Sequence, residues 1–211
     1  MAPLNFRETI GILRDKLSET LPGQRAHKVL EPAYRRDLQR SPGKDCKLSA
    51  VLILLYPTPT GNICFPLTLR QPHLGHHSNQ ISLPGGKVAE GDPDLQCTAL
   101  RETFEEIGIH SSQITVIGKL SPVFIPPTNF LVYPFVGYMN HAPAFQPQVG
   151  EVAAIFEANP YELLKSGNII FRPHIFNDRK YEVGGYKIAG HSVWGATGMI
   201  LTELKILLNI N

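Results

Sequence analysis

The stretch GGKVAEGDPDLQCTALRETFEEIGI, from Gly85 to Ile109, decides the fold of this chain. It ends in the pattern R-E-x-x-E-E-x-G-I, in which Arg101 precedes Glu102, Glu105 and Glu106. Residues three and four positions apart share one face of a helix, so the three carboxylates lie together. Like charges this close are costly unless a cation holds them. Hard divalent ions such as Mg²⁺ take carboxylate oxygens and bind substrate phosphates on their other side. The pattern therefore predicts a metal site suited to the hydrolysis of a diphosphate.

The residues around this pattern predict a turn followed by one helix. The run Leu83-Pro84-Gly85-Gly86 is a cluster of breakers that ends a strand. We expect Asp92 to cap the helix, with Pro93 at its first position, and Gly108 to terminate it. The apolar positions of this helix recur at helical spacing and are Leu95, Ala99, Leu100, Phe104 and Ile107. We expect Arg101 to pair with Glu105, four residues later, or to hold its neighbour in position.

This stretch resembles the Nudix box, G-x5-E-x7-R-E-U-x-E-E-x-G-U, where U is a bulky aliphatic residue. The matching positions are Gly86, Arg101, Glu102, Glu105, Glu106, Gly108 and Ile109. Asp92 stands in place of the first glutamate, and eight residues rather than seven separate it from Arg101. Thr103 takes a position that is usually aliphatic. The resemblance implies an α/β fold, the Nudix-like α/β/α sandwich with a mixed β-sheet.

Upstream residues resemble the signature of one Nudix subgroup, the coenzyme A diphosphatases, which reads L-L-T-x-R-[S/A]-x3-R-x3-G-x3-F-P-G-G. The run PLTLRQPHLGHHSNQISLPGG keeps six signature positions at the right spacing, namely Leu67, Thr68, Arg70, Pro84, Gly85 and Gly86. The replaced positions include Gln71, Gly75, Asn79 and Leu83. Near the C-terminus, HSVWGATGMI resembles the W-G-x-T helix start of the same subgroup. The similarity therefore spans about Ser49 to Leu208.

The charge pattern assigns roles within the box. Glu102 and Glu106 are expected to be ligands of Mg²⁺ or Mn²⁺, because they lie one turn apart on the same face. Glu105 is expected to be a further ligand or a base, and Arg101 to assist catalysis. The Gly86 carbonyl is expected to complete the metal's coordination, because glycine allows close approach of the backbone. The alternative interpretation is an acidic helix face that only meets solvent.

Residues outside the box complete the predicted site. Arg70 ends a strand before the site and is expected to bind a substrate phosphate, with a salt bridge to a box carboxylate as the alternative. His77, with His73 and His76, lies in a loop beside Arg70 and is a candidate for the same task or an exposed loop residue. Glu151 follows a late loop, from which many Nudix enzymes supply a base or an extra ligand. A solvated charge at a strand edge is its alternative.

Composition agrees with one globular domain. The chain has 211 residues, 43% hydrophobic and 18% charged, with a net charge of +2 that gives no reason to expect nucleic-acid binding. Three cysteines are scattered without zinc-ligand spacing, which indicates a reducing compartment. No signal peptide or membrane-spanning run is visible, so a cytoplasmic location is expected. We expect residues 1–48 to form an N-terminal helix and connecting segment that packs on a Nudix domain at 49–211.

Periodicity predicts the order of elements along the chain. Helices are expected at Leu4 to Leu21 and Thr197 to Leu208, with a short one at Pro160 to Lys165 and a connecting segment from Gln24 to Lys47. The expected strands are Ser49 to Tyr56, Ile63 to Arg70, Gln80 to Leu83, Ile114 to Leu120, Val132 to Met139, Val152 to Ala158, Ile169 to Ile175 and Tyr181 to Ile188. Strands and helices mixed in this order indicate an α/β sandwich.

Three functions follow from these observations. The first is metal-dependent hydrolysis of a diphosphate bond in a nucleoside diphosphate derivative, with coenzyme A or its acyl derivatives as candidates. The second is hydrolysis of ADP-ribose or a nucleoside triphosphate. The third is a Nudix-fold module that binds a nucleotide without hydrolysing it. The expected partner is a small nucleotide-type diphosphate rather than nucleic acid or membrane. The oligomeric state, including a homodimer, is left open.

Overall fold

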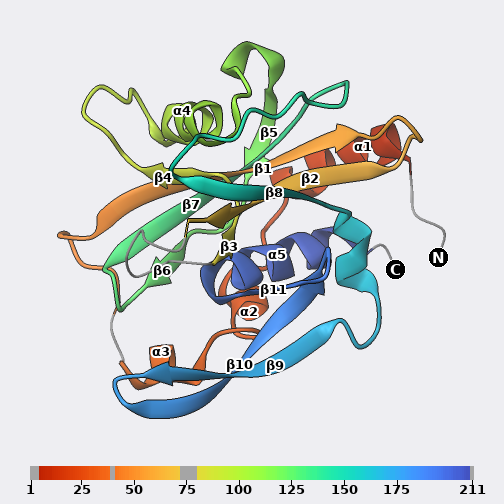
Figure 1. Ribbon diagram of the computed structural model, residues 1–211. Coiled ribbons are helices and arrows are strands. Elements are labelled where there is room, and N and C mark those ends of the chain that lie inside the picture. The colour runs from red at the N-terminus through yellow and green to blue at the C-terminus, as the bar shows by residue number, and fades with distance from the viewer. Residues whose placement is uncertain (1–4, 39–40, 72–79, 210–211) are drawn as a thin grey trace.

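A mixed β-sheet forms the centre of the molecule, as the computed structural model in Figure 1 shows. The structure describes residues 5–38, 41–71 and 80–209. The strands are β1 (Lys47–Pro57), β2 (Ile63–Arg70), β3 (Ile81–Ser82), β4 (Gly85–Lys87), β5 (Thr115–Lys119), β6 (Val123–Ile125), β7 (Phe130–Tyr138) and β8 (Val152–Ala158). They follow the order β3-β2-β1-β7-β5, with β4 paired to β1, β6 to β7 and β8 to β2. Only β1 and β7 run parallel among these pairs, so the mixed sheet is confirmed.

Strand β1 is buried on both faces and divides the core in two. Ala50, Leu52 and Leu54 pack in a cluster with Ala99 and Ile107 of α4 (Leu95–Ile107). The alternate residues of β1 pack in the other cluster, which includes apolar residues of α1 (Phe6–Ser18) and α5 (Gly195–Leu208). Successive side chains of a strand point to opposite faces, so this division follows from the strand period. In Figure 1, α4 covers one side of the sheet and α5 lies on the other.

A second sheet of three antiparallel strands lies below α5 in Figure 1. It consists of β9 (Ile169–Phe176), β10 (Arg179–Ile188) and β11 (His191–Trp194). Asn177 and Asp178 join β9 to β10 with positive φ values of 48° and 60°, which fits a tight two-residue hairpin turn. The predicted hairpin is therefore present, and the expected late short helix is the 3₁₀ turn η3 (Pro160–Leu164).

The N-terminal segment contains more structure than expected. The expected first helix is found as α1, with Asn5 and Glu8 forming a capping box. The region predicted as a connecting segment holds two further helices, α2 (Gln24–His27) and α3 (Ala33–Asp37). Neither is long enough to show a helical period in the sequence, since each spans little more than one turn. The chain also makes a short 3₁₀ turn, η2 (Ser111–Gln113), before β5.

Candidate active site

Helix α4 carries the three glutamates of the box, and both of its ends are capped. Asp94 accepts a hydrogen bond of 2.7 Å from the Cys97 N–H and is the N-cap, so the prediction that Asp92 caps this helix was wrong. Gly108 ends the helix with φ 76°, as predicted. Asp92 does not cap the helix because its carboxylate accepts hydrogen bonds from Arg101, Ala89 and Thr98 instead.

Asp92 anchors Arg101 to the turn that precedes α4. Its carboxylate accepts from Arg101 Nε at 2.9 Å and Nη2 at 3.0 Å, and also from the Ala89 N–H and the Thr98 hydroxyl. These hydrogen bonds, led by those from Arg101, hold the pKa of Asp92 well below its usual range. The extra residue between Asp92 and Arg101 is thus compatible with a close ion pair.

Arg101 organises the box but has no N–H left for a substrate. Its five hydrogen bonds go to both oxygens of Asp92, to Glu102 Oε1 at 2.9 Å, to Glu105 Oε2 at 2.8 Å and to the Lys87 carbonyl at 2.9 Å. A guanidinium has five N–H donors, so all are used. The expected pair with Glu105 is present, and the arrangement makes Arg101 a residue that positions Glu102 and Glu105.

Glu102 meets the backbone at Gly86. A Cβ atom at Gly86 would collide with the Glu102 carboxylate, so only glycine leaves room for it. Burial raises the pKa of Glu102, while the hydrogen bond from Arg101 lowers it. Gly86 and Glu102 both belong to the box pattern. Packing also links them, because the Glu102 carboxylate can take this position only beside a residue without a Cβ atom.

Glu106 is a buried carboxylate without a cationic partner. It is 5% exposed, and it accepts a hydrogen bond of 3.2 Å from the Gly85 N–H. No Lys, Arg or His of the described ranges forms an ion pair with it. Burial raises the pKa of Glu106 to about 8, and the charges of Glu151 and Glu102 add to this shift. Buried carboxylates are normally paired or bound to metal, so this group fits a cation.

Arg70 and Glu151 lie together at the side of this site. Arg70 ends β2, and its Nη2 lies 3.2 Å from Glu151 Oε1, just before β8. Arg70 thus pairs with Glu151 rather than with a box carboxylate. Both side chains remain about one-third exposed, at 36% and 35%, so a substrate can reach them. Their charges act on Glu106 in opposite directions, which places them near it.

The donor set suits a hard divalent ion, although the side chains are not closed around one. Among residues 5–38, 41–71 and 80–209, no three His, Cys, Asp or Glu side chains converge as a metal cluster. Glu102 and Glu106 both meet the Gly85–Gly86 backbone, whereas Glu105 is turned toward Arg101 and is half-exposed. Carboxylates with a nearby backbone are the ligands that Mg²⁺ and Mn²⁺ prefer. Glu102 and Glu106 are therefore the residues that fit the ion.

The prediction for His77, with His73 and His76, concerns residues outside those that the structure describes. Trp194 ends β11 and contacts His174, with ring centroids 4.7 Å apart. Two contacts of the site were not predicted, the Gly85 N–H bound to Glu106 and the Lys87 carbonyl bound to Arg101. The glycine pair was their only signal in the sequence, since backbone groups carry no pattern of their own.

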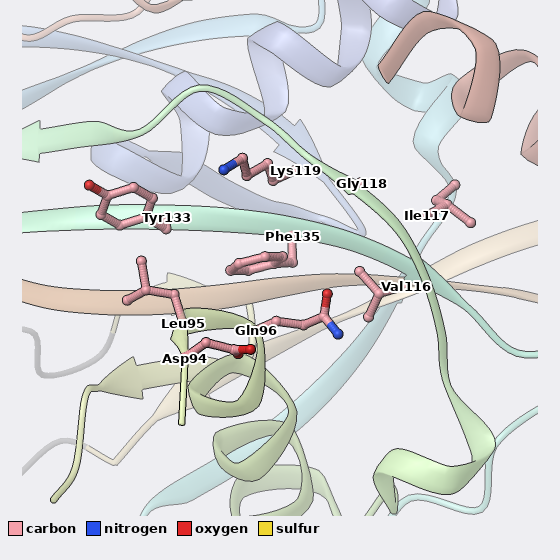
Figure 2. Close-up of a pocket in the computed structure, with 9 residues that line it drawn as sticks. All are labelled: Asp94, Leu95, Gln96, Val116, Ile117, Gly118, Lys119, Tyr133 and Phe135. Carbon is pink, nitrogen blue, oxygen red and sulfur yellow. The ribbon is translucent and has the colours of Figure 1, made fainter. Parts of the chain in front are cut away.

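A separate hollow of about 510 Å³ lies at the other end of α4. Figure 2 shows residues of the helix start, such as Gln96, facing Lys119 of β5 and Tyr133 and Phe135 of β7 across it. None of the box glutamates lines this hollow. The carboxylate site is therefore distinct from it.

Among the described helices none is long and apolar enough to cross a bilayer.

Comparison with known proteins gives the family. The NUDIX domain profile matches residues 47–173. Nudix hydrolase 15, mitochondrial, of Arabidopsis thaliana is 35% identical over 74% of this chain and 56% of its own length, so the chain spans about half of this plant relative. The uncharacterised Nudix hydrolase NudL of Yersinia enterocolitica is 35% identical over 77% of this chain and 82% of its own length. A Caenorhabditis elegans Ap4A hydrolase structure aligns with a TM-score of 0.52 at 19% identity, covering 77% of this chain and 97% of that one. This chain belongs to the Nudix hydrolase family.

Proposed function

We propose that the protein hydrolyses a diphosphate bond in a nucleotide derivative and uses Mg²⁺ or Mn²⁺ to do so. One observation carries the proposal: Glu106 is buried, has no cationic partner in the described chain, and shares the Gly85–Gly86 backbone with Glu102. Glu102 is paired with Arg101, but Glu106 has no ion pair among the described residues, and a buried carboxylate without a cation is costly. A bound divalent cation would remove this cost.

The residues of the chain divide the work as follows. Glu102 and Glu106 would hold the ion, which when bound would neutralise phosphate oxygens and lower the pKa of a bound water. Arg101 keeps Glu102 in place through its 2.9 Å hydrogen bond. Arg70 binds a phosphate oxygen of the substrate, since its guanidinium is exposed beside the carboxylates.

Glu151 is better placed than Glu105 to act as the base. Glu105 is bound to Arg101 at 2.8 Å, whereas Glu151 is paired only with Arg70 among the described residues. A substrate phosphate that takes over Arg70 frees the Glu151 carboxylate. Glu151 then accepts a proton from water while the water oxygen bonds to phosphorus and the bridging P–O bond breaks. The leaving group departs as a phosphate monoester.

Coenzyme A is the first candidate substrate, because six positions of the coenzyme A diphosphatase signature are kept. ADP-ribose and nucleoside triphosphates are the alternatives within the family, and a non-catalytic nucleotide-binding module is the alternative outside hydrolysis. A cytoplasmic location belongs to the same proposal, since three free cysteines suit a reducing compartment.

A substrate panel tests the proposal. The protein is incubated with Mg²⁺ or Mn²⁺ and each candidate, and the products are separated by chromatography. Coenzyme A should give 4′-phosphopantetheine and 3′,5′-ADP, and excess EDTA should stop the reaction. Cleavage of ADP-ribose with coenzyme A left intact would reject coenzyme A but keep the hydrolase. Nucleotide binding without cleavage of any candidate would favour the non-catalytic module.

A further inference from the structure

The hollow of about 510 Å³ at the start of α4 has an apolar floor and a polar rim. Its floor residues are buried or half-buried and include Leu95, Val116, Tyr133 and Phe135. Its rim residues are exposed and include Asp94, Gln96 and Lys119. Sites for small organic ligands are mostly apolar hollows of roughly 300 to 1,000 Å³ with a few polar groups that fix orientation. The size and lining of this hollow therefore match a ligand about as large as one nucleotide.

The hollow exists because α4 covers only part of its face of the sheet. The helix packs chiefly on β1 and β4, whereas β7 and β5 continue the sheet beyond it, and β5 is the last strand of the order. Tyr133 and Phe135 alternate along β7 and therefore point to the same side as α4. Tyr133 is half-buried, and Phe135, at 8% exposed, closes the bottom of the hollow. A planar ring can stack on an aromatic floor of this kind.

A β-bulge in β5 turns Lys119 toward this hollow. Val116 pairs with Gly137 and Lys119 pairs with Phe135, so three steps along β5 match two steps along β7. A regular ladder counted from Val116 would place Lys119 opposite Pro134, and its side chain would point to the other face of the sheet. Bulges re-aim side chains in this way, often beside binding sites. The bulge therefore gives the hollow a cation that a regular strand would not supply.

The charges on the rim are separated. Lys119 is exposed and forms no ion pair in the part of the chain that the structure describes. In Figure 2, Asp94 and Gln96 lie on the other side of Phe135 from Lys119. The hollow thus offers a positive charge on one side, and a carboxylate and an amide on the other. A complementary ligand has an anionic group at one end and hydrogen-bond donors at the other.

An adenine nucleotide carries its groups in this order. Its phosphate is anionic, its base is a planar ring, and the exocyclic amino group of the base donates hydrogen bonds. A lysine ammonium binds phosphate as a point charge, and a glutamine amide matches the donor and acceptor on one edge of adenine. Repulsion from the Asp94 carboxylate favours the orientation in which the phosphate lies at Lys119.

The hollow shares α4 with the box but none of the residues that fit the metal. Asp94 and Glu102 are eight positions apart, which is roughly 12 Å along a helix. Neither Glu102 nor Glu106 lines the hollow. A ligand bound there is therefore held without a divalent ion.

We infer that this hollow is a binding site for an adenine mononucleotide, separate from the box. The base lies on Tyr133 and Phe135, with its amino group toward Asp94 and Gln96. The phosphate contacts Lys119. Binding there does not depend on the proposed hydrolysis, because the two sites share no side chain. A hollow left only by loose packing would need neither the bulge nor an unpaired cation turned toward it.

A titration followed by backbone amide NMR signals, in excess EDTA, tests this site without metal or turnover. We expect AMP to bind the wild-type protein with a Kd of about 1 mM or tighter. Adenosine lacks the phosphate, and IMP has a carbonyl in place of the amino group, so each should bind at least about tenfold more weakly. The signals that move should belong to β5 and to the start of α4, and those of Gly85 to Lys87 should stay in place.

Matched variants identify the contacts. Lys119→Gln should weaken AMP binding at least about tenfold and adenosine binding less than about twofold. Lys119→Arg keeps the charge and should stay within about threefold of wild type for AMP. Tyr133→Leu should weaken both ligands, because it removes the ring but leaves the cation. Lys187→Gln, which removes an exposed charge on β10, is the control and should behave as wild type.

Three results would overturn the inference. One is the absence of signal changes up to about 10 mM AMP. Another is AMP binding that is centred on Gly85 to Lys87 and unchanged in Lys119→Gln, which places the nucleotide at the box. The third is a dimer in sedimentation that Tyr133→Leu disrupts and AMP does not, which makes the hollow an interface between two copies of the chain. If Tyr133→Leu fails to fold, the two substitutions of exposed Lys119 still decide.

Discussion

The backbone N–H of Gly85 donates to the carboxylate of Glu106 at 3.2 Å, which ties the glycine turn to the last helical turn of the box. The two residues are 21 positions apart, and the contact holds a buried carboxylate beside the chain segment that carries Gly86. Turn and helix therefore form one unit. A change in either should be felt at the carboxylates.

The carboxylates themselves give the first prediction. Glu102→Gln and Glu106→Gln should each lower kcat at least about a hundredfold, or about 2.7 kcal/mol of barrier, because each amide is a poor ligand for a divalent ion. Thermal unfolding should show a folded protein, since neutralising one of two close carboxylates relieves repulsion. Glu90→Gln, exposed in the turn before the helix, serves as the control. Near-normal turnover in both variants would contradict the assignment of Glu102 and Glu106 as metal ligands.

Gly86 gives a prediction about packing. A Cβ atom in Gly86→Ala would meet the Glu102 carboxylate, so the carboxylate or the turn must move. We expect kcat to fall at least about tenfold, and stability to fall by about 1 to 3 kcal/mol from overpacking. The same change at Gly11 in α1, where nothing lies within 4 Å, should be stabilising by about 0.5 to 1 kcal/mol. Equal behaviour of the two alanine variants would show that Gly86 has no special contact.

The Arg70–Glu151 pair predicts a split in the kinetic constants. Arg70→Ala should raise KM, because the substrate phosphate loses a bidentate donor. Glu151→Gln should mainly lower kcat, since it leaves Arg70 free but removes the base. Steady-state kinetics at saturating metal distinguish the two effects. An unchanged kcat/KM in Arg70→Ala would return Arg70 to a purely structural ion pair.

Glu203 of α5 predicts acid sensitivity of the fold. It is fully buried and accepts hydrogen bonds from the Gly23 N–H, the Ser121 N–H and hydroxyl, and His27 Nε2. Burial alone would raise its pKa, but these hydrogen bonds outweigh burial and hold the pKa of Glu203 below its ordinary value. Its contribution to stability is therefore complete above about pH 4.3, the value of a free glutamate, and is lost as the pH falls through the lower folded pKa.

Urea unfolding between pH 3 and 7 measures this contribution. Glu203→Gln should cost about 1 to 3 kcal/mol near neutral pH, because one oxygen acceptor is lost and buried donors are left unpaired. The difference from wild type should shrink as the pH falls below about 4.3. Glu19→Gln, which touches only an exposed pair with Lys16, should change stability by less than about 1 kcal/mol. A difference that stays constant with pH would contradict the role of Glu203.

The sequence predicted the long elements well and the short ones poorly. Strands β1 and β2 and helices α1 and α5 are periodic over many residues, so their apolar positions leave a clear signal. Helix α3 and strand β6 span five and three residues, and their positions depend on contacts such as that between Arg35 and Phe124. Such contacts join distant parts of the chain, and local pattern carries no trace of them.

The same limit applies within the candidate site. The spacing of Glu102, Glu105 and Glu106 predicted which residues share a helix, but not that a single Arg101 nitrogen, Nη1, binds both Glu102 and Glu105 while Glu106 is left without an ion pair among the described residues. Asp92 and Asp94 are both good capping residues, and only the ion pair to Arg101 decides that Asp94 takes the cap. The box pattern indicated which residues belong to the site. Which contacts each of them makes depends on competition between neighbouring carboxylates for the same donors.

The parallel pair of β1 and β7 has a consequence for how the chain assembles. In this pair Lys47 aligns with Phe130 and Leu55 with Tyr138. By contrast, Ala50 aligns with Gly86 of β4, a strand that is much closer to β1 in sequence than β7 is. Contacts between residues near in sequence close smaller loops and form faster. During synthesis, β1, β4 and α4 therefore leave the ribosome together and can meet before β7 exists. The part of the protein that carries the box is thus positioned to form early, and the parallel pairing of β1 waits for β7, a strand made some eighty residues after β1 begins.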